Sequence, residues 1–382
     1  MRTKVLIIGA GPSGCMAAYR LASRGINDIL LVDRCNFPRI KPCAGGIAPS
    51  AIKFLKKTGL EHILTDLTPR AEMRRLRFVG PRGQRIMLTS NLKAITINRK
   101  IFDETLLKLA KRAGAKFIPK FNVRELLRDG RGMIIGATDG KKTIHSEVTV
   151  LATGGHNKNF RDKYFVDKRP LRLIYSRIGW WKGFKLDDGM MEMIFDRDYV
   201  PHYGWVFPEG DGIVNIGVCL YEDKMKGKNM TDIFNEYLNK YHAERLAKAT
   251  PVGRSLSFVI NTTGSVKHVY ANRMLYVGEA GRMCNPATAE GISYAMESGW
   301  LAAEAIIQAY EKGTHDTPDE KALEGYEKMC QTAFNFRLRR ASIFNRLIDS
   351  PVLNFLINIS MTKYSQKFIT RFFGDLSSGI RC

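Results

Sequence analysis

The stretch Lys4-Val-Leu-Ile-Ile-Gly9-Ala-Gly11-Pro-Ser-Gly14 decides the fold of the N-terminal part of the chain. The apolar, β-branched run before Gly9 predicts a buried parallel strand, and a helix is expected directly after it. A second apolar run ends at Asp33 and closes a βαβ unit of about thirty residues. Gly9 permits a tight turn, Gly11 lets the backbone approach a pyrophosphate, and Gly14 lets helix and strand pack closely.

A glycine pattern alone is a weak signal, because glycine-rich turns are common. Strand, helix and acid together predict a site for the ADP portion of a dinucleotide. The carboxylate of Asp33 would accept hydrogen bonds from the adenosine ribose, and the positive end of the helix would favour the phosphate charge. These residues do not by themselves distinguish FAD from NAD.

The rest of the chain contains two kinds of strand-like segment. Runs at Ala115–Ile118, Glu147–Ala152 and Met274–Gly278 resemble further buried strands, whereas residues 166–262 carry alternating, aromatic-rich segments typical of an antiparallel sheet. We therefore expect an α/β fold with a discontinuous Rossmann domain and an inserted sheet domain. The expected segments are 1–70, 98–165 and 265–312 for the Rossmann domain, 71–97 and 166–264 for the sheet domain, and 313–382 for a C-terminal helical region.

Composition narrows the class of protein. The chain has 382 residues, 45% of them apolar and 25% charged, which excludes a disordered or fibrous protein. Its seven cysteines form no CxxC pair and no metal-like cluster, so we expect reduced thiols, a cytoplasmic location and no metal site. The N-terminus enters a strand without a leader, and no apolar run approaches the roughly 18 residues of a spanning helix.

The formal net charge of +23 would attract an anionic partner. Nucleic acid, an anionic membrane surface and a phosphorylated substrate all fit, and so does a plain solvated surface. No nucleic-acid reading motif is present, so we expect no nucleic-acid binding. From Phe334 onward, apolar clusters alternate with basic residues, which predicts amphipathic helices that cap the core or also contact a membrane.

Three further motifs indicate chemistry. They are Lys41-Pro-Cys-Ala-Gly-Gly46, the segment Tyr276–Ile292 with its Asn-Pro-Ala-Thr-Ala-Glu-Gly-Ile ending, and Tyr203-Gly-Trp-Val-Phe-Pro208. Strand alternation places the three aromatic side chains of the last motif on one face. Such a face is either ordinary sheet core or a wall for a long apolar ligand.

Together and in this order, the three motifs resemble the geranylgeranyl reductase family of FAD-dependent oxidoreductases, within the para-hydroxybenzoate hydroxylase-like superfamily. The resemblance implies a glutathione-reductase-type Rossmann domain, bound FAD and a role in lipid biosynthesis. It also implies reduction of carbon–carbon double bonds in an isoprenoid or prenyl-lipid substrate by hydride from reduced flavin N5. The implied catalytic residues are Cys43, Tyr203 and Trp205, and the implied substrate contacts are Tyr203, Trp205 and Phe207. The implied cofactor contacts are Gly9, Ala10, Gly11, Pro12, Ser13, Gly14, Asp33, Arg34, Ala44, Gly45, Gly46, Arg99, Val123, Thr153, Gly154, Gly278, Glu279, Pro286, Gly291 and Ile292.

The chain departs from the family pattern at several positions. Glu279 stands where an Asp is usual, Arg282 replaces a small residue and Ala289 replaces a Gly. The turn at residues 152–155 lacks the Asp that many superfamily members place there, so the electron donor is either NADPH or reduced ferredoxin, and the basic surface could attract an acidic carrier. A flavin monooxygenase or halogenase of the same fold and a non-catalytic flavin or lipid-binding protein remain alternatives.

Overall fold

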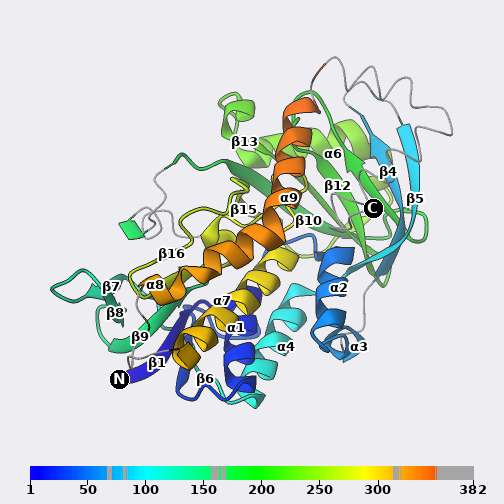
Figure 1. Cartoon of the computed structure of the whole chain (residues 1–382). Helices are drawn as coiled ribbons and strands as arrows, with labels where there is room; N and C mark the ends of the chain where they lie inside the picture. Colours follow the sequence, from blue (N-terminus) through cyan, green and yellow to red (C-terminus); the bar gives the residue numbers. More distant parts are fainter. Residues whose placement is uncertain are drawn as a thin grey trace.

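The computed structural model describes residues 1–66, 71–80, 83, 85–155, 163–164, 169–312, 318, 320–348 and 350, apart from the side chains of residues 66, 88 and 90–93. Within these residues the chain forms two β-sheets with helices packed around them (Figure 1). The first sheet and its helices occupy the lower left of Figure 1, and the second sheet occupies the upper right.

The first sheet is built on the glycine-rich strand. Strand β1 (Arg2–Ile8) lies between β2 (Ile29–Val32) and β9 (Thr143–Leu151), and all three are parallel. The near-continuous apolar sequence of these strands suits burial on both faces, and the predicted parallel strands are confirmed. The remaining strands are β6 (Lys116–Ile118), β7 (Glu125–Arg128), β8 (Ile134–Thr138), β16 (Tyr270–Ala271) and β17 (Met274–Tyr276).

Three helices cover one face of this sheet. Helix α1 (Pro12–Ser23) packs against α4 (Arg99–Arg112) and α7 (Ile292–Lys312), as Figure 1 shows. Buried Ala and Leu side chains of α1 allow this close packing. Helix α4 begins where the Asn98 side chain accepts a hydrogen bond from the backbone N–H of Lys100. Shorter elements complete this half: α2 (Pro49–Lys57), α3 (His62–Asp66) and the 3₁₀ turn η2 (Gly278–Gly281).

The second sheet is antiparallel except at one junction. The parallel pair joins β4 (Ala71–Val79) to β11 (Met190–Ile194). These strands come from separate parts of the chain, so no hairpin dictates their direction. The other strands are β3 (Gly46–Ile47), β5 (Arg85–Thr96), β10 (Leu173–Lys182), β12 (Gly204–Gly210), β13 (Ile213–Tyr221), β14 (Thr250–Pro251) and β15 (Leu256–Asn261).

Helices also connect the two halves. Helix α6 (Met230–Leu246), preceded by η1 (Glu222–Met225), packs on the second sheet. Helix α9 (Gly325–Leu347) follows the short α8 (Glu320–Leu323) and crosses the molecule (Figure 1). Its Phe334 is buried in the core beside the first sheet, and its Phe344 is buried in the core of the second. The expectation that the C-terminal region caps the core is confirmed up to residue 348, and residues 351–382 lie outside the described part.

Helices of the described residues are all too short or too polar to cross a membrane. In the same residues, no group of three or more His, Cys, Asp or Glu side chains is arranged to hold a metal ion. The division of the chain into six segments stays a prediction. Strand β3, which that division places in the Rossmann domain, pairs with β5 of the second sheet.

Candidate active site

Two glycines fix the turn that follows β1. Gly9 has a φ of +108°, and a Cβ there would collide with the carbonyl oxygen of Ala152 at the end of β9. A Cβ on Gly14 would collide with the Gly9 carbonyl oxygen. Only glycine at both positions allows β1, β9 and α1 to meet this closely.

The N-terminus of α1 is open to an anion. Gly11 is its N-cap, no side chain caps it and no acid occupies its first turn, which begins with Pro12. A guanidinium nitrogen of Arg39 lies 3.6 Å from the place that a Cβ on Gly11 would take. Asp33 accepts hydrogen bonds from the backbone N–H groups of Ala10 and Cys35, each at 2.8 Å. The carboxylate therefore stands next to the glycine turn, as the sequence predicts.

A buried ion cluster lies beside this turn. Asp103 is fully buried and accepts two hydrogen bonds from Arg99, at 2.8 and 3.0 Å. It also forms an ion pair with Arg39 at 2.9 Å. Burial disfavours the Arg99 charge, but Asp103 outweighs burial and raises the pKa of Arg99 above its ordinary value. Asp103 was not among the predicted site residues, although its spacing of four residues from Arg99 on a helix was a usable signal.

The loop before β3 brings Cys43 to the same cluster. The Cys43 sulfur accepts a hydrogen bond from the backbone N–H of Gly45 at 3.4 Å, and its interaction with Arg99 helps to raise the pKa of that guanidinium. Lys41 is also near, and burial lowers its pKa despite the opposing charge of Glu279. The Cys43 side chain thus lies beside the Arg99 guanidinium and near the Lys41 side chain.

The turn after β17 meets the turn after β9. The Glu279 carboxylate accepts a hydrogen bond from the backbone N–H of Asn261 at 2.7 Å, and it occupies the space that a Cβ on Gly155 would need. Gly154 and Gly155 therefore lie close to Glu279, and Thr153 lies beside Gly9.

The two unusual residues of this region keep left-handed backbones. Arg282 has a φ of 61° and donates to the carbonyl of Arg169 at 2.9 Å, and Ala289 has a φ of 53°. Ala289 therefore retains the backbone shape that a glycine would take, at a cost of about 1–2 kcal/mol.

The aromatic face of β12 bridges the two loops that the resemblance assigns to the flavin. At one end the Tyr203 hydroxyl donates to the carbonyl of Thr288. At the other end the Phe207 ring lies 3.3 Å from the place that a Cβ on Gly46 would take. Between them, the Trp205 indole N–H donates to the Asn215 side chain at 2.8 Å. Burial raises the pKa of Tyr203 well above its ordinary value, so its phenol stays protonated.

A cavity of about 270 Å³ lies along this wall. Its lining is mainly apolar and comes from the Cys43 loop, the Thr288–Ile292 segment and the inner face of the second sheet. The predicted residues that line it are Cys43, Ala44, Gly46, Tyr203, Trp205, Phe207, Gly291 and Ile292. The lining residues that sequence reasoning missed include Arg74, Ser176, Met191, Met193, Cys219, Phe258 and Ile260.

Other predicted contacts lie at the edges of the site. Val123 is buried in the apolar cluster that contains Val32 of β2, and the carbonyl of Pro286 accepts a hydrogen bond from Asn345 of α9. The open N-terminus of α1 and the nearby cations would hold the pyrophosphate of an FAD, and the loops at the adjoining cavity would hold its flavin.

Of the remaining predicted residues, Ser13 lies beside Gly278, since a Cβ on Gly278 would lie 3.3 Å from the Ser13 hydroxyl oxygen. Gly45 lies against the carbonyl of Ile97, and Arg34 directly follows Asp33. The role of each predicted residue stays a prediction.

Comparisons with known proteins agree with this geometry. Residues 2–162 match the FAD binding domain family, and residues 180–258 match the geranylgeranyl reductase catalytic domain. The second match includes β12 and its aromatic wall.

Curated relatives extend the match along the chain. The chain is 24% identical to digeranylgeranylglycerophospholipid reductase 2 of Methanopyrus kandleri over 92% of its own length and 89% of the relative. It is 28% identical to digeranylgeranylglycerophospholipid reductase of Methanocaldococcus jannaschii, over 85% of its own length and 81% of the relative.

Solved structures share the fold. A geranylgeranyl bacteriochlorophyll reductase-like protein of Thermoplasma acidophilum is 19% identical, with a TM-score of 0.82 over 99% of this chain and 96% of that one. The flavin-dependent brominase Bmp2 is also 19% identical, with a TM-score of 0.79 over 99% and 94% of the two chains. The two domain matches and the reductase relatives show that the chain is an FAD-dependent oxidoreductase that is similar to the geranylgeranyl reductases.

Proposed function

We propose that the chain reduces carbon–carbon double bonds in an isoprenoid or prenyl-lipid substrate with hydride from FAD. One observation carries this proposal: an apolar cavity joins the aromatic face of β12 to both loops expected to hold the flavin. An apolar chain in that cavity would lie beside both of these loops. The names of the curated relatives support a prenyl-lipid substrate.

In this reaction, bound reduced FAD would supply a hydride from N5, and the protein would orient the substrate, exclude water and supply a proton. The wall of Tyr203, Trp205 and Phe207 aligns the alkene and excludes water. A proton must reach the second alkene carbon. Cys43 lies in the cavity beside Arg99, and the protonated Tyr203 hydroxyl lies at the other end of the wall. The Trp205 N–H is bonded to Asn215, so we assign Trp205 to the wall.

Product mass tests the proposal. Reduced enzyme incubated anaerobically with a geranylgeranyl lipid should yield a product two hydrogens heavier per double bond. Oxygen consumption with appearance of a hydroxylated or halogenated product would instead favour a monooxygenase or halogenase. Photoreduced flavin that no alkene reoxidises would favour a non-catalytic flavin or lipid-binding protein.

A cysteine pair tests the proton donor. Cys43→Ala should lower the rate of alkene reduction about 10²- to 10⁴-fold and leave FAD content unchanged, because it removes an acid and no cofactor contact. Cys219→Ala is the matched control, since Cys219 lines the same cavity but burial raises the pKa of its thiol to about 12. Equal rates of alkene reduction in the two variants would indicate that Tyr203 or water, and not Cys43, donates the proton.

The electron donor is the second open part of the reaction. We propose reduced ferredoxin or NADPH, with ferredoxin favoured by the net charge of +23 and by the turn at residues 152–155. Association with an acidic carrier should weaken steeply as salt rises. Flavin reduction by NADPH at a rate that salt does not change would contradict this preference.

We also propose that α9 contacts an anionic membrane surface. Phe336, Ile343 and Leu347 are about half exposed on one face of the helix, at 53%, 56% and 46%. The basic residues Arg339 and Arg346 share that face at helical spacing. An apolar stripe flanked by Arg suits the headgroup region of an anionic bilayer.

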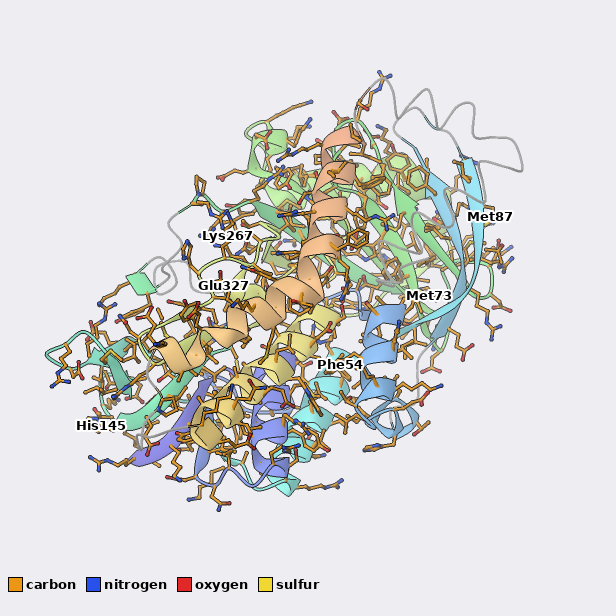
Figure 2. The ribbon with its side chains drawn as sticks, viewed as in Figure 1. Phe54, Met73, Met87, His145, Lys267 and Glu327 are labelled. Carbon is orange, nitrogen blue, oxygen red and sulfur yellow. The ribbon has the colours of Figure 1, made fainter. Side chains whose placement is uncertain are left out.

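Vesicle sedimentation tests the membrane contact. Ile343→Glu should weaken binding to anionic vesicles, whereas Met87→Glu, on the exposed hairpin strand β5, should not. Figure 2 shows Met87 at the outer edge of the second sheet, away from α9. Equal binding by both variants and the wild type would remove α9 from the membrane contact.

A further inference from the structure

Arg74 is the single cationic side chain among the described residues that line the cavity. The other charged lining residue, Glu290, is already engaged, because it accepts hydrogen bonds from the backbone N–H and the hydroxyl of Ser293 at 2.8 and 2.7 Å. The Arg74 side chain is 56% exposed and forms an ion pair with Glu72 at 3.2 Å. Arg74 therefore marks an end of the cavity that opens to solvent.

A β-bulge turns Arg74 toward the cavity. The pairing of β4 with β5 shifts register between Met73 and Arg75, and the backbone N–H groups of Arg74 and Arg75 both donate to the carbonyl of Gly189, each at 3.0 Å. In a regular strand, consecutive side chains point to opposite faces. The bulge instead lets Met73 and Arg74 both contact the cavity.

The N-terminus of α2 lies at the same end. Ile47, at the end of β3, pairs with Ile95, which pairs with Glu72. The next pair along is Ala94 with Met73, and Ala48 follows Ile47 toward that row. Ala48, Ala94 and Met73 all line the cavity. Two strand spacings, about 10 Å, separate Ala48 from Met73. Figure 2 shows Met73 beside α2.

This helix end is also open. Ala48 is the N-cap of the nine-residue α2, no side chain caps it, and no acid lies in its first turn. The positive end of the helix and the Arg74 guanidinium therefore flank one rim of the cavity.

A second polar group of the cavity lining has no partner among the described residues. Ser176, on β10, is fully buried and lines the cavity, and its hydroxyl has no hydrogen-bond partner within the described residues. A buried hydroxyl without a partner is unfavourable. A ligand, with the water that accompanies it, would complete the cavity.

From these contacts we infer that Arg74 and the N-terminus of α2 bind the phosphate headgroup of the substrate. The apolar chain then runs from β4 across β11, β12, β13 and β10 to Phe258 and Ile260 on β15. Five strand spacings, about 24 Å, span this path, which suits a long prenyl chain. The inference rests on the proposed function and adds a residue that selects phosphorylated prenyl lipids.

Paired substrates of one chain length test it. Wild-type enzyme should reduce geranylgeranyl phosphate with a lower KM than geranylgeraniol, which lacks the phosphate. Arg74→Ala should raise the KM for the phosphate about 10- to 100-fold, as expected for a charged hydrogen bond, and leave its kcat and both constants for the alcohol unchanged. Arg74→Lys should recover part of the loss, because it keeps the charge and loses the fork geometry.

Arg75→Ala is the matched control, because it removes the same charge from the neighbouring residue, whose side chain donates to the carbonyl of Asp188. An equal rise in KM for both substrates, or no rise for the phosphate, would overturn the inference. Inhibition of geranylgeraniol reduction by inorganic phosphate as strong as that by geranylgeranyl phosphate would also overturn it, because it would indicate a site for free phosphate. If the wild type reduces neither compound, the proposed function fails, and tryptophan fluorescence then tests the headgroup site alone. Quenching by geranylgeranyl phosphate but not by geranylgeraniol, abolished in Arg74→Ala, would still support the headgroup site. No such quenching would overturn the headgroup site.

Discussion

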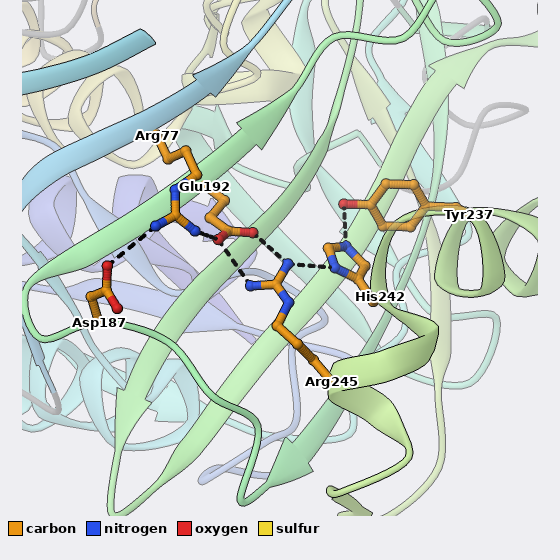
Figure 3. Close-up of polar contacts among 6 residues, drawn as sticks. All are labelled: Arg77, Asp187, Glu192, Tyr237, His242 and Arg245. Carbon is orange, nitrogen blue, oxygen red and sulfur yellow. Dashed lines mark hydrogen bonds and ion pairs between the residues drawn. The ribbon is translucent and has the colours of Figure 1, made fainter. Parts of the chain in front are cut away.

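The two faces of the second sheet differ in their polar contacts: one carries a network of ion pairs, and the other is mainly apolar. Strand β11 contributes side chains to both faces. Met191 and Met193 face the cavity, whereas Glu192 between them faces α6. The Glu192 carboxylate accepts hydrogen bonds from Arg77 at 2.6 Å and from Arg245 at 2.9 Å twice (Figure 3). Glu192 and Arg77 are direct neighbours in the parallel pair of β11 and β4, so the network also joins the two parts of the sheet.

The network continues into α6. Arg245 donates to Nδ1 of His242 at 2.9 Å, and a guanidinium can only donate. The ring proton therefore lies on Nε2, which contacts the Tyr237 hydroxyl at 3.0 Å (Figure 3). Burial and the Arg245 charge lower the pKa of His242 to about 3, so the ring is neutral near pH 7.

Among the described residues, the cavity face has no ionic network of this kind. Its Ser176 hydroxyl is unpartnered within the described residues, and most of its lining is apolar. We infer that the α6 face holds the sheet together and that the cavity face is left for a ligand. Substitutions on the α6 face should therefore change the free energy of unfolding, and substitutions on the cavity face should change catalysis.

Glu192→Ala should have the largest effect on stability. It leaves Arg77 and Arg245 without their shared carboxylate, and both are about one-third exposed, so we expect a loss of about 2–3 kcal/mol in the free energy of unfolding. Urea unfolding measures it. The control Asp187→Ala removes an exposed partner of Arg77 and should cost less than about 1 kcal/mol. Similar losses in the two variants would contradict a structural role for the buried carboxylate.

Acid should weaken the same face. The unfolded His242 gains a proton below its ordinary pKa of 6.5, but the folded ring stays neutral until about pH 3, so stability should fall as pH drops through this window. Arg245 and Arg77 outweigh burial and lower the pKa of Glu192, which adds to the loss below pH 4.5. His242→Gln should show a smaller loss between pH 7 and pH 5. An unchanged loss would mean that other groups, such as His202, carry the effect.

Tyr203→Phe should have a smaller effect on stability and a visible one on catalysis. It removes the hydroxyl that donates to Thr288, so we expect a loss of about 1 kcal/mol in the free energy of unfolding. The rate of alkene reduction should also fall, because the wall no longer holds the Thr288 loop. A stability loss without any change in rate would separate Tyr203 from the reaction.

Ser176→Ala should change stability least. It deletes a buried hydroxyl that has no partner within the described residues. The free energy of unfolding should therefore stay within about 0.5 kcal/mol of the wild-type value or rise above it. Any change in substrate KM measured alongside would then report on the ligand. A loss above 2 kcal/mol would show that the hydroxyl has a structural partner after all.

The N-terminal fold was predictable because it depends on residues close together in the sequence. Gly9 and Gly14 lie where a tight turn and a close helix–strand contact leave no room for a side chain. The aromatic wall was predictable from strand alternation at residues 203–207. Arg74 was not, because a bulge breaks that alternation, and Glu192 was not, because its partners lie on β4 and α6. Contacts between segments far apart in the sequence carry no local pattern.

Anaerobic stopped-flow spectroscopy tests the central claim most directly. Reduced enzyme mixed with geranylgeranyl phosphate should return to the oxidised flavin spectrum, with one double bond saturated for each flavin reoxidised. Cys43→Ala should slow this return, whereas Cys219→Ala should not. A flavin that stays reduced in the presence of the lipid, and returns only when oxygen is admitted, would contradict the account.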